Sequence, residues 1–251
     1  MEKGKGRLIN FKKGIDYEKM QEYLETLVEQ YSFLGVESLG VSFGGRTIPV
    51  ISMGRGKKEV LYLGALRGNE SDTSLALMRF INEYAEIYMQ RGRIYKNRAE
   101  DIFEERTIHV IPMLDVDGVE YFANGIKDKD ELYDRMCKGE GDGAKESGAL
   151  DNFIRFNEAL KGIVSLRQGK NGLSFFGRGT RAISMAKCFS KMTGFSLDAS
   201  IDGENDTEAF LRELEIPHVS LRCGDTGKKE DTLFSIYSSA REILFSAPFM
   251  I

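Results

Sequence analysis

The stretch that decides the fold of this 251-residue chain is Val60-Leu61-Tyr62-Leu63-Gly64-Ala65-Leu66-Arg67-Gly68-Asn69-Glu70. Its first four residues are apolar and predict a short buried strand that runs into a turn with two glycines. Ser71 or Asp72 can cap the next helix, because apolar residues recur at helical spacing from Leu75 onward. A strand followed directly by a helix is a unit from which α/β sheets are built.

The same alternation continues along the chain. Strands are predicted at 36–41, 48–53, 107–114, 163–166 and 218–221, and helices at 17–31, 151–160, 181–192, 208–214 and 232–245. The polar, glycine-rich stretch 127–148 is predicted to be a surface loop. This order indicates one α/β domain over 1–251, with a largely parallel or mixed sheet covered on both faces.

Composition excludes several classes of partner and site. The formal net charge of -4, from 35 basic and 39 acidic side chains, gives no reason to propose nucleic acid or an anionic membrane. No apolar run follows the basic N-terminus, so we expect neither a secretory signal nor a membrane span. The three cysteines, Cys137, Cys188 and Cys223, suggest reduced thiols and a cytoplasmic protein. With only His109 and His218 as imidazoles, the chain is poorly equipped for a zinc enzyme.

Three predicted strand ends, 63–70, 111–119 and 216–224, together resemble the zinc carboxypeptidase family of carboxypeptidase A type. The nearest branch is similar to bacterial peptidases that cut γ-D-glutamyl-diaminopimelate bonds in cell-wall peptides. The resemblance includes Gly40–Arg46, is strongest over 15–125, weakens over 126–160 and returns over 161–224. It implies a mixed sheet of roughly eight strands with helices on both faces.

The resemblance also implies where a zinc site would lie. The family binds zinc with His-x-x-Glu and a later histidine, and uses a glutamate as general base. Here Arg67 and Glu70 stand at the first pair of positions, Leu166 at the second histidine, and Arg222 at the general base. Arginine offers a metal no lone pair and cannot take a proton from water. We therefore expect no bound zinc, no cofactor and no catalytic residue of the family's kind.

The family's substrate-binding arginine follows a Gly-Val-Asp-Leu-Asn run, and the best remnant here is 148–152. Asn152 and Arg155 are therefore candidate ligand-binding residues, together with Arg67, Glu70 and Arg222. We expect Arg67 or Arg222 to pair with Glu70, because a buried carboxylate left alone is costly. The expected ligand is a peptide or small carboxylate.

Other polar residues have simpler interpretations. Arg167 and Arg178 are expected to be solvated surface residues. His109 is expected to be a satisfied core residue and His218 a polar strand residue, while Asp115 and Asp117 fit a turn held by local hydrogen bonds.

Three alternatives to a degenerate carboxypeptidase-like protein stay open. The chain could be an active metallocarboxypeptidase with unexpected metal ligands, or an interaction or scaffold protein whose pocket is filled. The aspartoacylase-like branch also suits Gly68-Asn69-Glu70, but it needs the same missing histidine.

Overall fold

The computed structural model describes residues 15–124, 144–176, 180–197, 206–224 and 232–251. In order along the chain, the elements described are α1 (Tyr17–Gln30), β1 (Gly35–Val41), β2 (Thr47–Gly54), β3 (Lys58–Leu63), η1 (Gly68–Glu70), α2 (Ser71–Met89), β4 (Arg93–Ile94), β5 (Asn97–Arg98), α3 (Ala99–Glu105), β6 (Arg106–Ile111), α4 (Val116–Ala123), α6 (Ala144–Phe156), β7 (Leu160–Gly169), β8 (Gly172–Phe176), α7 (Thr180–Thr193), α8 (Asp206–Glu213), β9 (His218–Gly224), α9 (Thr232–Ser246) and η3 (Ala247–Phe249).

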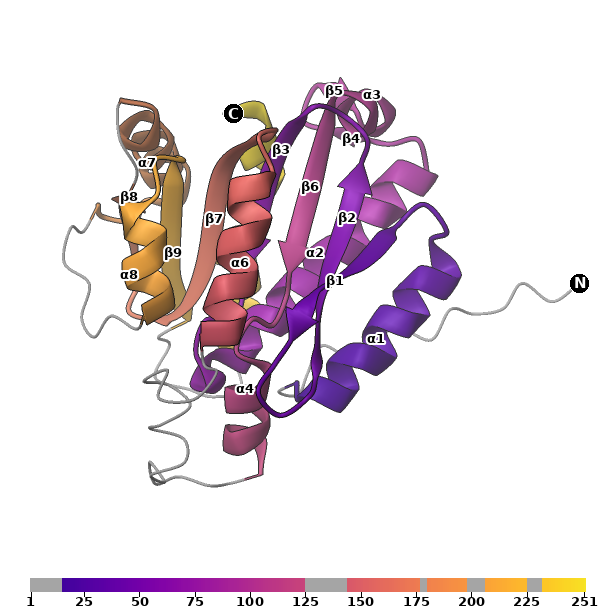
Figure 1. Cartoon of the computed structure of the whole chain (residues 1–251). Helices are drawn as coiled ribbons and strands as arrows, with labels where there is room; N and C mark the ends of the chain where they lie inside the picture. The colour runs from indigo at the N-terminus through magenta and orange to yellow at the C-terminus, as the bar shows by residue number, and fades with distance from the viewer. Residues whose placement is uncertain (1–14, 125–143, 177–179, 198–205, 225–231) are drawn as a thin grey trace, which may run out of the picture.

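The predicted α/β fold is confirmed, with a mixed sheet between helices (Figure 1). In the described residues the main sheet has seven strands, in the order β1-β2-β6-β3-β7-β9-β8, so it is slightly smaller than the expected eight. The central strands β6, β3, β7 and β9 are parallel to one another, whereas β1, β2 and β8 complete the two sides by antiparallel pairing.

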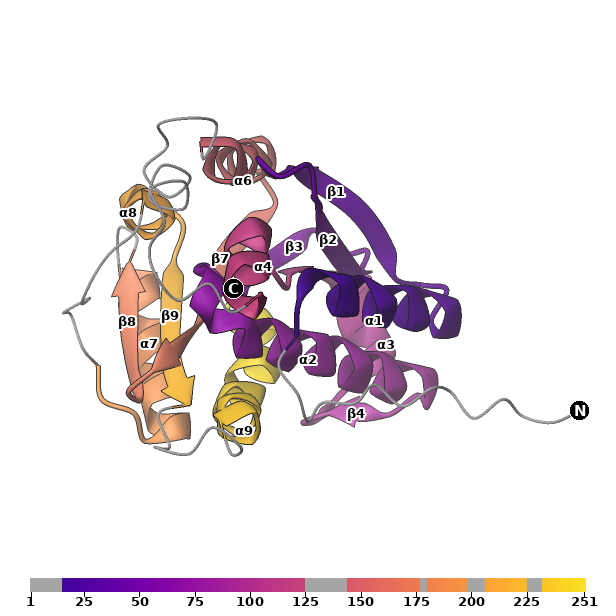
Figure 2. The ribbon, with the colours of Figure 1, turned by 90° about the horizontal axis from the view of Figure 1, so that it is seen from below.

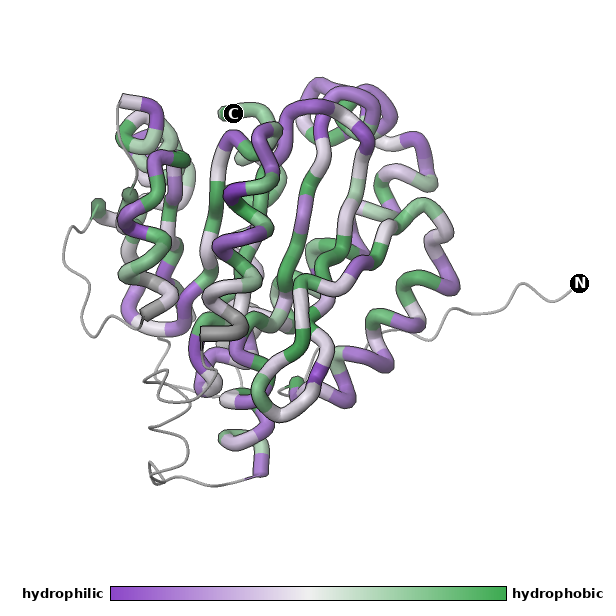
Figure 3. The backbone as a smooth tube through the Cα atoms, in the orientation of Figure 1, coloured by the Kyte–Doolittle hydropathy of each residue, from purple (hydrophilic) through white to green (hydrophobic). Residues whose placement is uncertain are grey.

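Helices cover the two faces of the sheet (Figure 2). On one face, the Tyr62 ring lies 5.4 Å from Phe80 of α2, and its hydroxyl donates to the Leu244 carbonyl of α9 at 2.6 Å. On the other face, Phe153 of α6 packs edge-on against His109 at 5.4 Å. Figure 3 shows hydrophobic residues concentrated in the strands, with hydrophilic segments on the outer helices. Apolar alternation along each element therefore produces the layered core.

Several predicted boundaries differ from the structure. The helix predicted from Asp151 begins earlier, at Ala144, because the stretch after the glycines already has helical periodicity. The predicted loop, 127–148, lies outside the described residues as far as 143, and its last residues form the first turns of α6. The strand β8 and the helices α3 and α4 are not among the predicted elements.

None of the helices in the described ranges is long and apolar enough to cross a membrane.

Candidate functional site

The parallel strands β6, β3, β7 and β9 all end at one edge of the sheet, beside α4 and η1 (Figure 1). Leu63 at the end of β3 is the register partner of Ser165 in β7, and Arg167 of β7 is the partner of Arg222 in β9. Partners on neighbouring strands point to the same face. The register therefore gathers polar side chains at this edge, where α/β sheets place their ligand sites.

The turn after β3 fixes the position of Glu70. A Cβ added to Gly68 would lie 2.2 Å from the carbonyl carbon of Gly118, so only glycine allows η1 to pack this closely on α4. The hydroxyl of Thr73 accepts from the backbone N–H of Ala65 at 2.7 Å and donates to the carbonyl of Glu70 at 2.7 Å. Glu70 is consequently held with only 4% of its surface exposed.

Glu70 pairs with Arg167. The Arg167 Nε lies 2.8 Å from each of the two Glu70 carboxylate oxygens, and the side chains are 9% and 5% exposed respectively. A buried carboxylate is stable only with such a partner, because its desolvation is otherwise uncompensated. The expectation that Arg167 is a solvated surface residue is therefore wrong. The expected partner of Glu70 was Arg67 or Arg222, whereas the carboxylate is paired with Arg167.

Leu166, the residue predicted at the second histidine position, does not face Glu70. Leu166 is completely buried, whereas Arg167 reaches Glu70. Alternate residues of a strand point to opposite faces, so an alignment shifted by one residue exchanges the site face for the core face. Arg167 therefore has its side chain on the face of β7 that meets Glu70, and Leu166 has its side chain on the opposite face. The Ser165-Leu166-Arg167 alternation of polar, apolar and charged residues was the sequence signal for this assignment.

Two more arginines border this pair. Arg222, at the predicted general-base position, is half-buried, and a Cβ on Gly169 would lie 3.0 Å from its Cδ. Within the described part of the chain, the side chain of Arg222 makes no hydrogen bond or ion pair. Arg67 is half-buried at the start of η1, and its carbonyl accepts from the Glu70 N–H at 3.0 Å. We call Arg67, Glu70, Arg167 and Arg222 the arginine cluster.

Asn152 and Arg155 do not join this cluster. Both are exposed on α6, and Arg155 bonds to Asp151 one helical turn earlier. The 148–152 stretch is part of helix α6 and is not extended. This helix packs beside β1, with Ala149 against Gly40. The predicted ligand-binding role of these two residues is therefore not supported by their placement.

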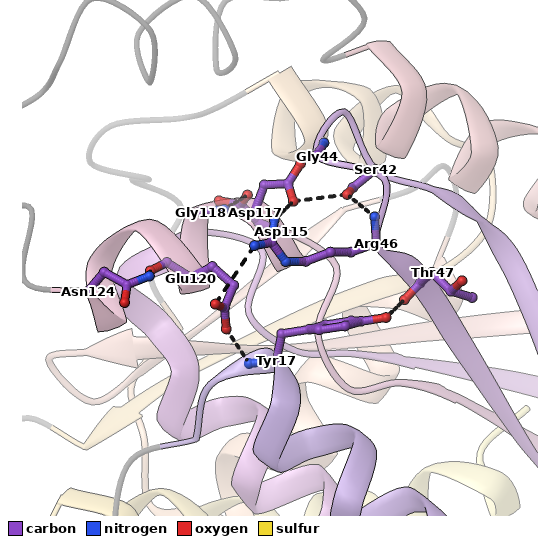
Figure 4. A network of polar contacts seen from close by, with 10 residues as sticks. All are labelled: Tyr17, Ser42, Gly44, Arg46, Thr47, Asp115, Asp117, Gly118, Glu120 and Asn124. Atoms are coloured by element: carbon purple, nitrogen blue, oxygen red, sulfur yellow. Dashed lines mark hydrogen bonds and ion pairs between the residues drawn. The ribbon is translucent and has the colours of Figure 1, made fainter.

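A second polar network lies at the same edge, and Figure 4 shows its residues. Asp117 accepts hydrogen bonds from the Ser42 hydroxyl at 2.9 Å, the Gly44 N–H at 2.6 Å and the Arg46 Nη1 at 2.6 Å. Glu120 accepts from the backbone N–H of Tyr17 at 2.7 Å, and lies 3.8 Å from Arg46 Nη2. We call these residues the turn network, because they tie the β1–β2 turn to α4.

Asp115 caps the start of α4, accepting from the Gly118 N–H at 2.9 Å. Burial raises the pKa of its carboxyl to about 6, assisted by the negative charges of Asp117 and Glu70. The prediction that Asp115 and Asp117 form a hydrogen-bonded turn is confirmed.

The two histidines lie on the same face of the sheet as Arg167 and Arg222. His218 is buried, and its Nε2 lies 2.8 Å from the Ser165 hydroxyl. Desolvation lowers the pKa of its imidazole to about 3, with a contribution from the charge of Arg167, so the ring is neutral at ordinary pH. His109 bonds to Ser52 through Nδ1 at 2.8 Å and to Glu59 through Nε2 at 2.6 Å, which confirms the satisfied-core interpretation.

The donors of the arginine cluster do not fit a catalytic zinc. Both oxygens of Glu70 accept from Arg167, and guanidinium groups have no lone pair for a metal. Across the residues that the structure describes, no group of three or more histidine, cysteine, aspartate or glutamate side chains is placed to hold a metal ion. A catalytic zinc usually takes three protein ligands, and the arginine cluster has one carboxylate, which is already paired with Arg167.

Known proteins share both the sequence frame and the fold. The family model described as zinc carboxypeptidase matches residues 20–147. A γ-D-glutamyl-L-diamino acid endopeptidase of Lysinibacillus sphaericus is 26% identical over 167 residues, which cover 66% of this chain but only 42% of that protein.

Among solved structures, thrombin-activatable fibrinolysis inhibitor has a TM-score of 0.72 at 10% identity, covering 96% of this chain and 74% of that one. Carboxypeptidase A of Helicoverpa armigera has a TM-score of 0.71 at 12% identity, covering 96% and 73% respectively. At these identities the structural likeness shows the fold alone, and the family follows from the match to the sequence model. The chain belongs to the zinc carboxypeptidase family.

Proposed function

We propose that this protein is a zinc-independent carboxypeptidase-like protein that binds an anion at the arginine cluster. The observation that carries the proposal is the contact of Arg167 Nε with both oxygens of Glu70, the single acidic residue that matches a family zinc ligand. The Glu70 carboxylate is paired with one guanidinium group, and Arg222 lies beside Arg167 on the neighbouring strand. Arginine binds carboxylates through paired N–H groups, so a peptide or small carboxylate is the proposed ligand.

The same residues argue against peptide hydrolysis by the family's mechanism. Arg222 carries a permanent positive charge, so it cannot accept a proton from an attacking water. Arg67 and Arg167 can bind and orient an anionic group, but they cannot polarise a carbonyl as a metal does. We also propose that the protein is cytoplasmic and that neither nucleic acid nor membrane is a partner.

Metal analysis tests this proposal. Protein purified without added metal and without a histidine tag should contain less than roughly one-tenth equivalent of zinc and show no uptake in calorimetric titration. The double variant Arg67→His/Arg167→His supplies two imidazoles beside Glu70, and should gain roughly one zinc per chain.

Two results would count against the proposal. Nearly one tightly held zinc in the wild-type chain would restore the alternative of an active metallocarboxypeptidase with unexpected ligands. A folded double variant that takes up no zinc would show that Arg67 and Arg167 do not occupy ligand positions. If the wild type binds neither zinc nor anions, the alternative of a scaffold with a filled pocket gains support.

A further inference from the structure

A row of hydrogen-bonded side chains lies on the sheet away from the arginine cluster. The Ser52 hydroxyl lies 2.8 Å from Nδ1 of His109, and Nε2 of the same ring lies 2.6 Å from Oε2 of Glu59. Nδ2 of Asn157 donates to the same Glu59 oxygen at 2.5 Å. Glu59 comes four residues before Leu63, so about 13 Å of strand separates it from the carboxyl end of β3. We call Ser52, His109 and Glu59 the serine network.

The hydrogen bonds of the serine network define where the His109 ring holds its proton. An ionised carboxylate accepts hydrogen bonds and cannot donate them, so the neutral imidazole carries its proton on Nε2, which faces Glu59. Nδ1 is then an acceptor, and the Ser52 hydroxyl donates to it. A serine proton that points at an imidazole lone pair is the arrangement of a serine nucleophile and its base, with a carboxylate that orients the ring.

The serine network is open to solvent. The side chains of His109 and Glu59 are 13% and 18% exposed, and Ser52 is half-buried. Gly35, the register partner of Ser52, lies on β1 at the end of the strand order. A Cβ added to Gly35 would lie 3.6 Å from the Ser52 Cβ, an ordinary contact distance. The glycine therefore leaves space for a small group beside the Ser52 hydroxyl.

A second serine–histidine pair in the same sheet lacks these features. Ser165 is 1% exposed, and its hydroxyl lies 2.8 Å from Nε2 of His218. Nδ1 of His218 is buried and has no hydrogen-bond partner in the part of the chain that the structure describes. This pair is therefore closed to solvent and has no carboxylate to orient its ring, whereas the serine network has both access and an orienting carboxylate.

We propose that Ser52 is an acyl-accepting nucleophile, with His109 as its base, and that it reacts with small uncharged esters. Ser52 Oγ attacks the ester carbonyl carbon, and the hydroxyl proton passes to Nδ1 of His109. The tetrahedral adduct then expels the alcohol, which takes this proton, and the acyl group stays on Oγ. Water releases the acyl group as a carboxylic acid by the same two proton transfers, and Ser52 recovers its proton.

The surroundings of Ser52 limit the esters that fit. The negative charge of Glu59 disfavours an anionic ester, and the space beside Gly35 suits a short acyl group. None of these residues belongs to the arginine cluster, so this reactivity is independent of the proposed anion binding.

A fluorophosphonate tests the proposal on the full chain, because it phosphonylates an activated serine with loss of fluoride and stays attached. Peptide mass spectrometry should locate the phosphonyl group on Ser52. With p-nitrophenyl acetate, the release of p-nitrophenolate should fall to the uncatalysed rate in Ser52→Ala. Ser165→Ala is the matched control, since it removes the hydroxyl of the other serine–histidine pair and should leave both readouts unchanged.

Two further variants separate a base from a structural residue. His109→Gln keeps an acceptor and a donor at this position but cannot take up a proton, so phosphonylation should slow by at least about a hundredfold in a variant that still unfolds cooperatively. Gly35→Val places a branched side chain beside the hydroxyl and should slow both reactions, since extended backbone accepts valine readily.

Three results would overturn the proposal. One is a phosphonyl group found on other residues while Ser52 stays unmodified. Another is p-nitrophenolate release that is equal in the wild type and Ser52→Ala. The third is a folded His109→Gln that reacts as fast as the wild type, which would show that the imidazole is not the base.

Discussion

Two polar networks lie at the same edge of the sheet but differ in their balance of charge. In the turn network, Arg46 faces two carboxylates, Asp117 and Glu120, and the remaining donors are neutral N–H and hydroxyl groups. In the arginine cluster, the single carboxylate of Glu70 is paired with Arg167, and Arg222 lies on the next strand. The turn network follows the family's sequence pattern, whereas the arginine cluster replaces it.

This difference separates a structural network from a proposed binding site. Asp117 has hydrogen-bond donors on several sides, all supplied by the protein, so nothing further is needed to stabilise it. In the arginine cluster, Arg167 compensates the charge of Glu70, and the Arg222 side chain has no hydrogen bond or ion pair in the part of the chain that the structure describes. Mutations in the turn network should therefore lower only stability, because its carboxylates are already hydrogen-bonded to other groups of the protein. Mutations in the arginine cluster, the proposed anion site, should also lower the affinity for a ligand.

The largest effect is expected for Glu70→Gln. This change removes the charge that compensates buried Arg167, so the free energy of unfolding should fall by about 3–5 kcal/mol. Denaturant unfolding followed by circular dichroism measures it. Asp151→Asn provides the control, because it breaks an exposed pair with Arg155 and should cost less than about 1 kcal/mol. Equal, small losses in both variants would show that the Glu70–Arg167 pair is not a buried ion pair.

The layered fold could be predicted from the sequence, because its strong signals are local. Short apolar strands such as 60–63, followed by helices with periodic apolar residues, are visible without knowledge of contacts. The strand β8 was missed because it has only five residues and Gly172 and Ser174 interrupt its apolar residues. Helix α6 was placed too late because Ser147 and Gly148 obscure its beginning.

The site could be predicted only in part, because it depends on strand register. Arg67, Glu70 and Arg222 were found from motif spacing, and Glu70 was expected to need a positive partner. The partner itself, Arg167, was missed because the family motif directed attention to its neighbour Leu166, whose side chain points to the opposite face of β7. Asn152 and Arg155 were included because a short run resembled a family motif, although the segment is helical and exposed.

A smaller effect is expected for Asp117→Asn in the turn network. The variant loses the ionic character of three hydrogen bonds, including that with Arg46, and the free energy of unfolding should fall by about 2–3 kcal/mol. Calorimetry should give an unchanged affinity for any anion that the wild type binds. A large loss of that affinity would mean that the two networks act as one site.

The smallest effect is a pH dependence that arises from Asp115, which lies between the two networks. Its folded-state pKa of about 6 exceeds the ordinary model value of 3.8, so the folded protein holds this proton more tightly than the unfolded chain. Stability from this group is therefore fully present below about pH 4 and is lost as pH rises through about 6. Since the side chain is only half-buried, we expect a loss of about 2 kcal/mol.

Asp115→Asn isolates this contribution. Between pH 4 and pH 7, the unfolding free energy of the variant should rise by about 2 kcal/mol relative to that of the wild type. His218 acts in the opposite direction: its lowered pKa reduces stability as pH falls below about 6.5 in both proteins, so it cancels in the difference. A difference that does not vary with pH would show that Asp115 is as easily ionised in the folded protein as in the unfolded chain. The negative charge between the turn network and the arginine cluster would then be fixed across this pH range.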